Sequence, residues 1–157
     1  MAQEIEHKFL VTDSSCISGA AGFRWRQAYL SRAPERTVRV RIGSETAFLT
    51  IKGRPRGAVR DEFEYPIPPN DAEQILSMCD GFVVEKTRYL IKYAGHTWEV
   101  DVFHGENEGL VLAEIELSKE GEPFELPPWV GKEVTNDNRY HNAALSAFPF
   151  RQWKNSL

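Results

Sequence analysis

Short runs of alternating apolar and charged residues make up most of the chain, and this period of two limits its fold more than any other feature. The runs at 37–43 (TVRVRIG) and 96–103 (HTWEVDVF) are clear examples. Successive side chains of a strand point to opposite faces, so each run predicts a strand with one charged face. Eight such runs follow at close spacing, at 4–11, 25–31, 37–43, 46–53, 60–67, 83–93, 96–103 and 110–118. They predict a mainly β protein of the α+β class, built as a barrel or a sandwich.

Two segments depart from this period and predict peripheral helices. Residues 70–79 begin with capping chemistry at Asn70 and Asp71. Residues 136–148 follow Thr135 and carry apolar residues at helical spacing until Pro149. The stretch 121–132 contains three prolines and predicts a loop. No repeat or linker divides the chain, so we expect residues 1–157 to form one domain.

The charge balance narrows the classes of partner. The formal net charge is −4, from 19 basic and 23 acidic side chains, which argues against a nucleic-acid groove based on bulk positive potential. No segment approaches the roughly 20 apolar residues of a membrane span. The two cysteines, Cys16 and Cys79, lack metal-ligand spacing and are typical of a reducing compartment. We therefore expect a cytoplasmic protein with no nucleic-acid or membrane partner.

Like charges recur two residues apart on five of the expected strands, with Glu99 and Asp101 as a sixth case. The five pairs are Glu4/Glu6, Arg39/Arg41, Glu62/Glu64, Lys86/Arg88 and Glu114/Glu116. A sheet with one solvated face also alternates, but neighbouring like charges there repel one another. Paired carboxylates instead suit a hard divalent cation, while Arg and Lys pairs suit phosphate oxygens. The pattern therefore favours faces that converge on a metal-bound polyphosphate.

These motifs resemble the CYTH family of triphosphate tunnel metalloenzymes over nearly the whole chain. Glu4-Ile5-Glu6-His7-Lys8 matches the N-terminal E-x-E-x-K signature. The remaining motifs follow in family order: R-x-R at Arg39 and Arg41, T-x-K ending at Lys52, E-x-E at Glu62 and Glu64, Glu85 to Tyr89, E-x-D reaching Asp101, E-x-E at Glu114 and Glu116, and E-V-T-x-D-x-x-Y-x-N from Glu133 to Asn142. The chain is most similar to the compact bacterial members, since it lacks long insertions.

The resemblance implies a closed eight-stranded antiparallel β-barrel forming a tunnel, with a few peripheral helices. It also implies a cofactor, Mg²⁺ or Mn²⁺, held by Glu4, Glu6, Glu62, Glu64, Glu114 and Glu116. The substrate phosphates would contact Lys8, Arg39, Arg41, Lys52, Lys86 and Arg88. The catalytic residues would be Lys8, Asp101 and Tyr29, with the Tyr29 hydroxyl orienting Lys8.

The expected function is divalent-metal-dependent hydrolysis of inorganic triphosphate to pyrophosphate and phosphate. Such phosphoryl transfer needs positioning and charge stabilisation, which agrees with the lack of a nucleophilic triad in the sequence. Three alternatives remain open: hydrolysis of an organic triphosphate (a nucleoside triphosphate or thiamine triphosphate), an adenylate cyclase of the same fold, and a non-catalytic polyphosphate-binding module.

Two further features are interpreted as structural. His7, His96, His104 and His141 show no metal-ligand spacing among themselves. The apolar tail 148–153 is expected to pack against the barrel, with a homodimer contact as its alternative.

Overall fold

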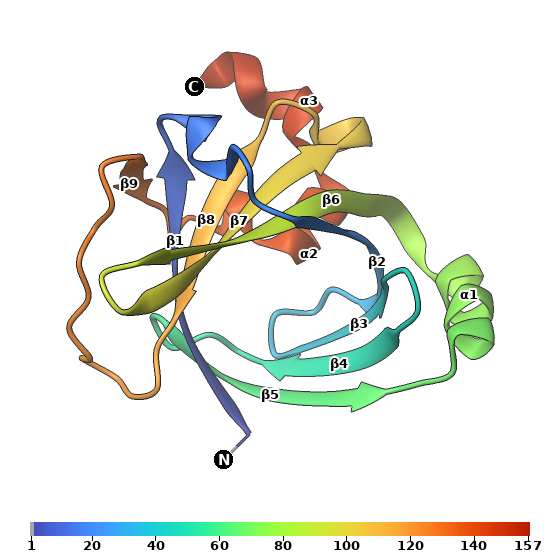
Figure 1. Cartoon of the computed structure of the whole chain (residues 1–157). Helices are drawn as coiled ribbons and strands as arrows, with labels where there is room; N and C mark the ends of the chain where they lie inside the picture. The colour runs from blue at the N-terminus through green and yellow to red at the C-terminus, as the bar shows by residue number, and fades with distance from the viewer. Residues whose placement is uncertain (1) are drawn as a thin grey trace.

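In the computed structural model, which describes residues 2–157, the strands form one sheet that closes on itself (Figure 1). The strands are β1 (Gln3–Val11), β2 (Gly22–Ser31), β3 (Arg36–Ile42), β4 (Ala47–Gly53), β5 (Val59–Pro66), β6 (Asp80–Tyr93), β7 (His96–His104), β8 (Val111–Glu116) and β9 (Val130–Glu133). Their bounds lie within a few residues of the runs expected from the sequence, apart from β9.

Ring closure depends on β1, because this strand pairs on both of its edges. One edge pairs with β8 from Glu6 to Leu10, and the other pairs with β5 from Gln3 to Ile5. The remaining strands complete a ring of eight in the order β1-β5-β4-β3-β2-β6-β7-β8, with every pair antiparallel. The predicted mainly β, tunnel-like fold is thus confirmed.

The helices are short. They are α1 (Pro69–Met78), α2 (Asn142–Ala147), α3 (Phe150–Trp153) and the 3₁₀ helices η1 (Ser14–Ile17), η2 (Gly105–Asn107), η3 (Asn138–Tyr140) and η4 (Lys154–Ser156). Within residues 2–157 none of them combines the length and the apolar character that a membrane crossing requires.

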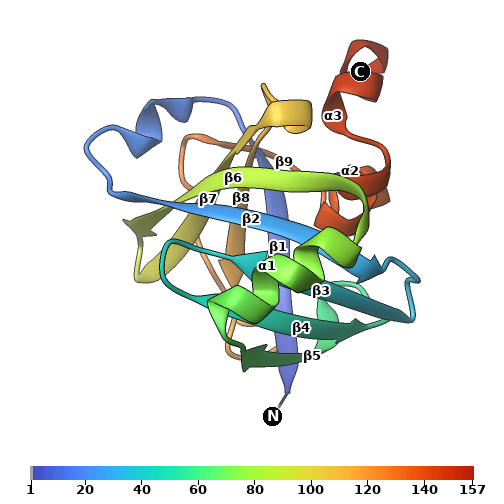
Figure 2. The same ribbon diagram turned by 90° about the vertical axis from the view of Figure 1, so that its right-hand side faces the viewer.

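Helix α1 lies across the outer face of β2, β3 and β4 (Figure 2). Its Ala72 packs against the outward side chains Val40, Ile42 and Ala47. The helix begins at Pro69, without the expected side-chain cap, because proline at the start of a helix loses no backbone hydrogen bond there. The expected helix is therefore present, with a different starting signal.

A second outer cluster lies on β1, β7 and β8. Phe9, Trp98, Val100 and Ile115 are buried there beneath the segment between β8 and β9, which contributes Phe124 and Trp129 among others. The outward faces of these strands are thus covered by apolar packing, and their other faces turn inward.

Along three strands the inward face changes from apolar to charged. The change runs from Val84 to Lys86 on β6, from Phe103 to Asp101 on β7 and from Leu112 to Glu114 on β8. Residues two apart share a face, so the apolar and charged members lie at successive depths in the ring. Leu145 of α2 and Tyr140 of η3 complete the apolar cluster. One part of the interior is therefore a packed apolar core, and the other part is lined by charged side chains.

The closing helix predicted over 136–148 is wrong in its extent. The chain forms η3, leaves helical geometry at His141 (φ −70°, ψ 139°) and starts again as α2. Asp137 caps the start of η3, because its side chain accepts a hydrogen bond from the Arg139 N–H, and the break follows one turn later at His141. As a result the carbonyl of Tyr140 is free to accept a hydrogen bond from the Lys8 ammonium, at 3.2 Å.

The loop expected over 121–132 was also wrong at its end, where β9 begins at Val130. Beyond Glu6, whose N–H donates to the Ala58 carbonyl oxygen, β1 leaves β5, so this edge of β1 would be unpaired from there onward. Strand β9 pairs with that edge at Phe9 and Val11. An unpaired strand edge exposes backbone hydrogen-bonding groups, and β9 covers them.

The apolar part of the interior gives a direct test of the fold. Leu145 is 0% exposed, so Leu145→Ala is expected to lower the free energy of unfolding by about 2–5 kcal/mol through a cavity. Urea denaturation measures this change. The matched control Leu126→Ala, at a side chain that is 57% exposed, is expected to stay within about 0.5 kcal/mol of the wild type. Equal effects of the two substitutions would contradict this packing.

Candidate active site

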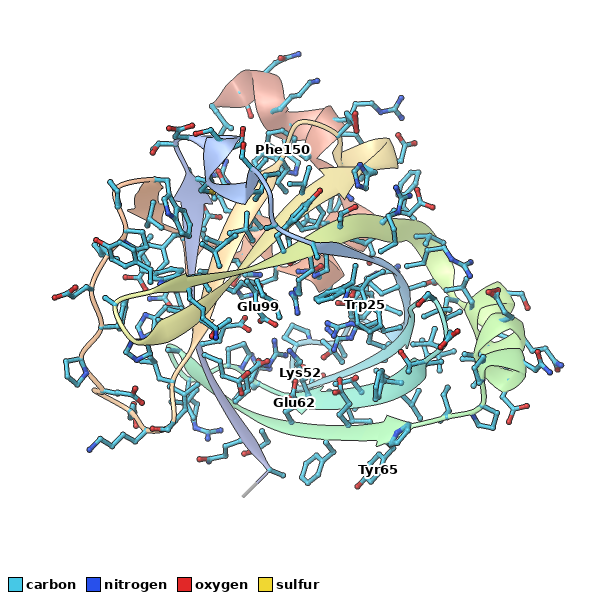
Figure 3. The ribbon with its side chains drawn as sticks, viewed as in Figure 1. Trp25, Lys52, Glu62, Tyr65, Glu99 and Phe150 are labelled. Atoms are coloured by element: carbon cyan, nitrogen blue, oxygen red, sulfur yellow. The ribbon has the colours of Figure 1, made fainter. Side chains whose placement is uncertain are left out.

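The charged part of the interior encloses a cavity of about 780 Å³. Figure 3 shows Lys52, Glu62 and Glu99 pointing into the space inside the ring, whereas Tyr65 points away from it. Of the residues predicted for the site, thirteen line the cavity: Glu4, Glu6, Lys8, Tyr29, Arg39, Arg41, Lys52, Glu62, Glu64, Lys86, Arg88, Glu114 and Glu116. Asp101 does not line it.

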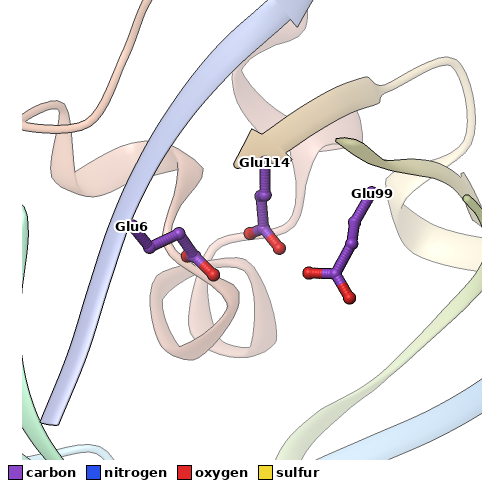
Figure 4. Close-up of side chains that lie close together, drawn as sticks. All are labelled: Glu6, Glu99 and Glu114. Carbon is purple, nitrogen blue, oxygen red and sulfur yellow. The ribbon is translucent and has the colours of Figure 1, made fainter. Parts of the chain in front are cut away.

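Three carboxylates from neighbouring strands converge in this cavity. Glu6 on β1, Glu114 on β8 and Glu99 on β7 each offer an oxygen, and these oxygens lie within 4.8 Å of one another (Figure 4). Burial and the adjacent Glu114 and Glu4 charges raise the pKa of Glu6 well above its usual range. Such a crowded set of oxygen ligands fits a hard divalent cation, which would relieve the repulsion.

Glu99 was not among the metal ligands expected from the sequence. It lies directly opposite Glu114 in the β7–β8 register, which brings the two carboxylates together. The Glu99/Asp101 alternation was the available signal, but the alternation alone does not show which member of the pair meets the other glutamates. The pairing register supplies that information.

The other four glutamates predicted as ligands lie elsewhere in the cavity. Glu4 accepts hydrogen bonds from Lys52 at 3.0 and 3.1 Å, and Glu62 lies 3.4 Å from the same ammonium. Burial, followed by repulsion from Glu4 and Glu62, raises the pKa of Glu116 to about 7. Glu4, Glu62 and Glu116 therefore form a second acidic group, beside the group of Glu6, Glu99 and Glu114.

Glu64 lies on the basic side of the cavity. It accepts a hydrogen bond from Thr50 at 2.8 Å and lies 3.5 Å from the guanidinium of Arg39. Thr50 and Glu64 face each other in the β4–β5 register, so this contact follows from strand pairing. In this structure Glu64 therefore contacts a cation of the cavity wall.

Arg88 is the most heavily paired cation of the site. Its Nε and Nη2 bind both oxygens of Asp101, at 2.7 and 2.8 Å. Its Nη groups also reach Glu114 at 2.9 Å and Glu99 at 3.1 Å. We call Glu6, Glu99 and Glu114 the acidic trio. Arg88 therefore links two members of this trio, Glu99 and Glu114, to the buried Asp101.

Asp101 is 1% exposed and lies behind Arg88, away from the cavity wall. Besides Arg88 it contacts the ammonium of Lys86 at 2.9 Å. Burial alone would raise the pKa of Asp101, but the two cations hold it below the ordinary value. Asp101 is thus shared by two basic side chains that line the cavity.

Lys8 lies between the acidic trio and the closing segment. Its ammonium is 3.2 Å from Glu114 and 3.2 Å from the carbonyl oxygen of Tyr140. Burial would lower the pKa of Lys8, but Glu114 and Glu6 raise it above the ordinary value. Tyr29 is buried in the same cavity, and within residues 2–157 no hydrogen bond joins it to Lys8. The proposed orienting role of Tyr29 stays a prediction.

The buried Asp101 pairing can be tested by removing its charge. Asp101→Asn leaves Lys86 and Arg88 without their shared carboxylate, so the free energy of unfolding is expected to fall by about 3 kcal/mol. Chemical denaturation measures the loss. The control Asp61→Asn, whose side chain is half exposed, is expected to cost less than about 1 kcal/mol. A similar small loss at position 101 would contradict a buried, essential pairing.

The comparisons with known proteins agree with this geometry. The family model described as CYTH domain matches residues 2–147. An inorganic triphosphatase of Acetivibrio thermocellus is 46% identical over 155 residues, covering 98% of this chain and 99% of the relative. An inorganic triphosphatase of Nitrosomonas europaea is 38% identical over 149 residues, covering 91% and 96%.

A solved structure has the same architecture. The crystal structure of an inorganic triphosphatase superposes with a TM-score of 0.65 at 36% identity, covering 93% of this chain and 95% of that one. The family match spans nearly the whole sequence, including the strands that carry the inward charges. This chain therefore belongs to the CYTH domain family.

Proposed function

We propose that this protein hydrolyses inorganic triphosphate to pyrophosphate and phosphate, with a divalent metal ion, inside the ring of strands. The observation that carries the proposal is the presence of an acidic trio and several basic side chains on the wall of one cavity. The 46% identity with an inorganic triphosphatase, over 98% of the chain, supports the same assignment.

Mg²⁺ or Mn²⁺ is the proposed cofactor. Glu6, Glu99 and Glu114 would hold it, since oxygen ligands of net negative charge suit these hard cations. Glu4, Glu62 and Glu116 form the neighbouring acidic group and would hold a second ion. When bound, the metal supplies positive charge that stabilises the phosphate oxygens during transfer.

The basic side chains would bind the three phosphates. They come from four strands and line the cavity: Lys8 on β1, Arg39 and Arg41 on β3, Lys52 on β4, and Lys86 and Arg88 on β6. Arginine binds phosphate through paired N–H groups, and lysine acts as a point charge. Together they would hold the triphosphate chain extended and offset the charge that develops on the pyrophosphate leaving group.

In the reaction itself, a water attacks the terminal phosphorus in line with the departing pyrophosphate oxygen. Lys8 would contact the reacting phosphate, a role supported by its ion pair with Glu114 of the acidic trio. Asp101 acts through Arg88 and Lys86, whose positions it fixes. Tyr29 lines the same cavity, and its hydroxyl is proposed to orient Lys8.

One experiment tests the proposed substrate against its alternatives. Tripolyphosphate, ATP and thiamine triphosphate are incubated separately with the purified protein and Mg²⁺ or Mn²⁺, and released phosphate is measured. Chelator-sensitive turnover strongest on tripolyphosphate is expected. Faster turnover of an organic triphosphate would replace the proposed substrate. Cyclic AMP formed from ATP would indicate a cyclase, and binding without any product would indicate a polyphosphate-binding module.

Metal binding gives a prediction that does not depend on turnover. At 100 times the dissociation constant, Mg²⁺ or Mn²⁺ is expected to raise Tm by about 5–10 °C, since it binds only the folded protein. Glu6→Gln and Glu114→Gln are each expected to abolish most of this rise and to lower turnover by about 100-fold or more. Differential scanning fluorimetry and phosphate release measure the two effects.

The control for this prediction is Glu45→Gln, which removes the same charge from the exposed β3–β4 turn. Its metal-induced rise in Tm is expected to match that of the wild type. An undiminished rise in Glu6→Gln would show that the acidic trio does not hold the metal.

A further inference from the structure

Arg41 differs from the other basic residues proposed to bind phosphate. Lys8, Arg39, Lys52, Lys86 and Arg88 each form an ion pair with at least one carboxylate. Within residues 2–157, Arg41 has no carboxylate oxygen within 4 Å. Its positive charge is therefore not compensated by a direct partner.

Neutral groups hold Arg41 instead. Its Nε donates a hydrogen bond to the side-chain oxygen of Gln27 at 3.2 Å, and its guanidinium lies 5.1 Å from the ring centre of Trp25. Gln27 is 0% exposed and faces Arg41 directly in the β2–β3 register. Strand pairing and stacking thus fix the guanidinium plane without adding negative charge.

The Gln27 amide has only one orientation that satisfies its neighbours. Arg41 can only donate, so the amide oxygen of Gln27 must face it, and the NH₂ group faces Asn142. The Asn142 oxygen accepts from Gln27 at 2.9 Å and from the Lys86 ammonium at 3.2 Å. Two neutral side chains therefore connect Arg41 on β3 with Lys86 on β6.

The two Nη groups of Arg41 make no hydrogen bond to protein within residues 2–157. Within the described chain, only its Nε makes a hydrogen bond to protein, and Arg41 lines the cavity wall. Burial, followed by repulsion from Arg39 and Arg88, lowers the pKa of Arg41 to about 10, so the guanidinium stays charged at neutral pH. Both Nη groups are available to an anion.

We propose that Gln27 is a positioning residue, assisted by Trp25, which holds Arg41 in place while leaving its charge available for the phosphate chain of the substrate. This inference rests on the proposed function, because that function identifies the anion bound by Arg41 as a triphosphate. A glutamate of almost the same shape at position 27 would pair with Arg41 permanently and compete with phosphate oxygens. The neutral side chain is what keeps this cation unpaired.

The test compares Gln27→Glu with Gln74→Glu, which adds the same charge on the exposed face of α1. Calorimetry measures the dissociation constant of tripolyphosphate in EDTA, where no metal-dependent turnover occurs. Gln27→Glu is expected to weaken binding by about tenfold or more, while Gln74→Glu stays within about twofold. With Mg²⁺, the same variant is expected to raise KM and to change kcat by less than about threefold.

A double substitution shows whether the effect passes through Arg41. In the Arg41→Ala background, Gln27→Glu is expected to weaken tripolyphosphate binding by less than about threefold more. A full additional tenfold loss would overturn the proposal, because the new carboxylate would then act elsewhere. Wild-type affinity in Gln27→Glu would overturn it as well.

Gln27→Met covers the case in which Gln27→Glu does not fold. It removes the hydrogen bonds but adds no charge, so binding is expected to weaken by about three- to fivefold, and only when Arg41 is present. A loss of the same size in the Arg41→Ala background would overturn the proposal. Absent turnover in the wild type, combined with the expected binding changes, would refute the proposed hydrolysis and leave the role of Gln27 intact. A wild type that does not bind tripolyphosphate would refute both.

Discussion

A charged group removed from water is stable only beside an opposite charge or a strong hydrogen-bond partner, and the interior of this ring contains many such groups. Glu114 shows how the structure meets this constraint. It pairs with Lys8 from β1 and with Arg88 from β6, and these cations with Lys86 and Lys52 hold its pKa far below the ordinary value although the residue is buried. Within residues 2–157 the neighbouring Glu6 forms no ion pair, and burial with the adjacent carboxylates raises its pKa. The proposed metal ion would offset this repulsion.

Packing in the apolar part of the interior positions groups that contact the charged part. Leu145 and Tyr140 pack with residues of β6, β7 and β8, which fixes η3 and α2 against the strands. The same segment supplies the Tyr140 carbonyl to Lys8 and the Asn142 side chain to Lys86. Hydrophobic packing therefore positions polar groups that strand pairing alone would not bring into the cavity.

The strands and their inward faces could be predicted from the sequence, because a period of two assigns every charged residue to a face. The predicted basic residues, including Arg39 and Lys52, line the cavity for this reason. Which carboxylates meet depends on register, and alternation carries no register information, so the sequence did not indicate that Glu99 lies with Glu6 and Glu114 or that Glu64 contacts Thr50. The break at His141 was missed because apolar residues at helical spacing do not show where the backbone leaves helical geometry.

The double pairing of β1 also bears on how the chain folds. Lys8 lies near the beginning of the sequence, yet its pairing partner is Glu114 and its hydrogen-bond acceptor is Tyr140. Contacts between such distant positions cost loop-closure entropy before they give any stabilisation, and they make folding slow. During synthesis β1 can pair with β5 early, but Lys8 can reach Glu114 and Tyr140 only after almost the whole chain has left the ribosome. The contacts that complete the charged interior therefore depend on the last part of the chain to be made.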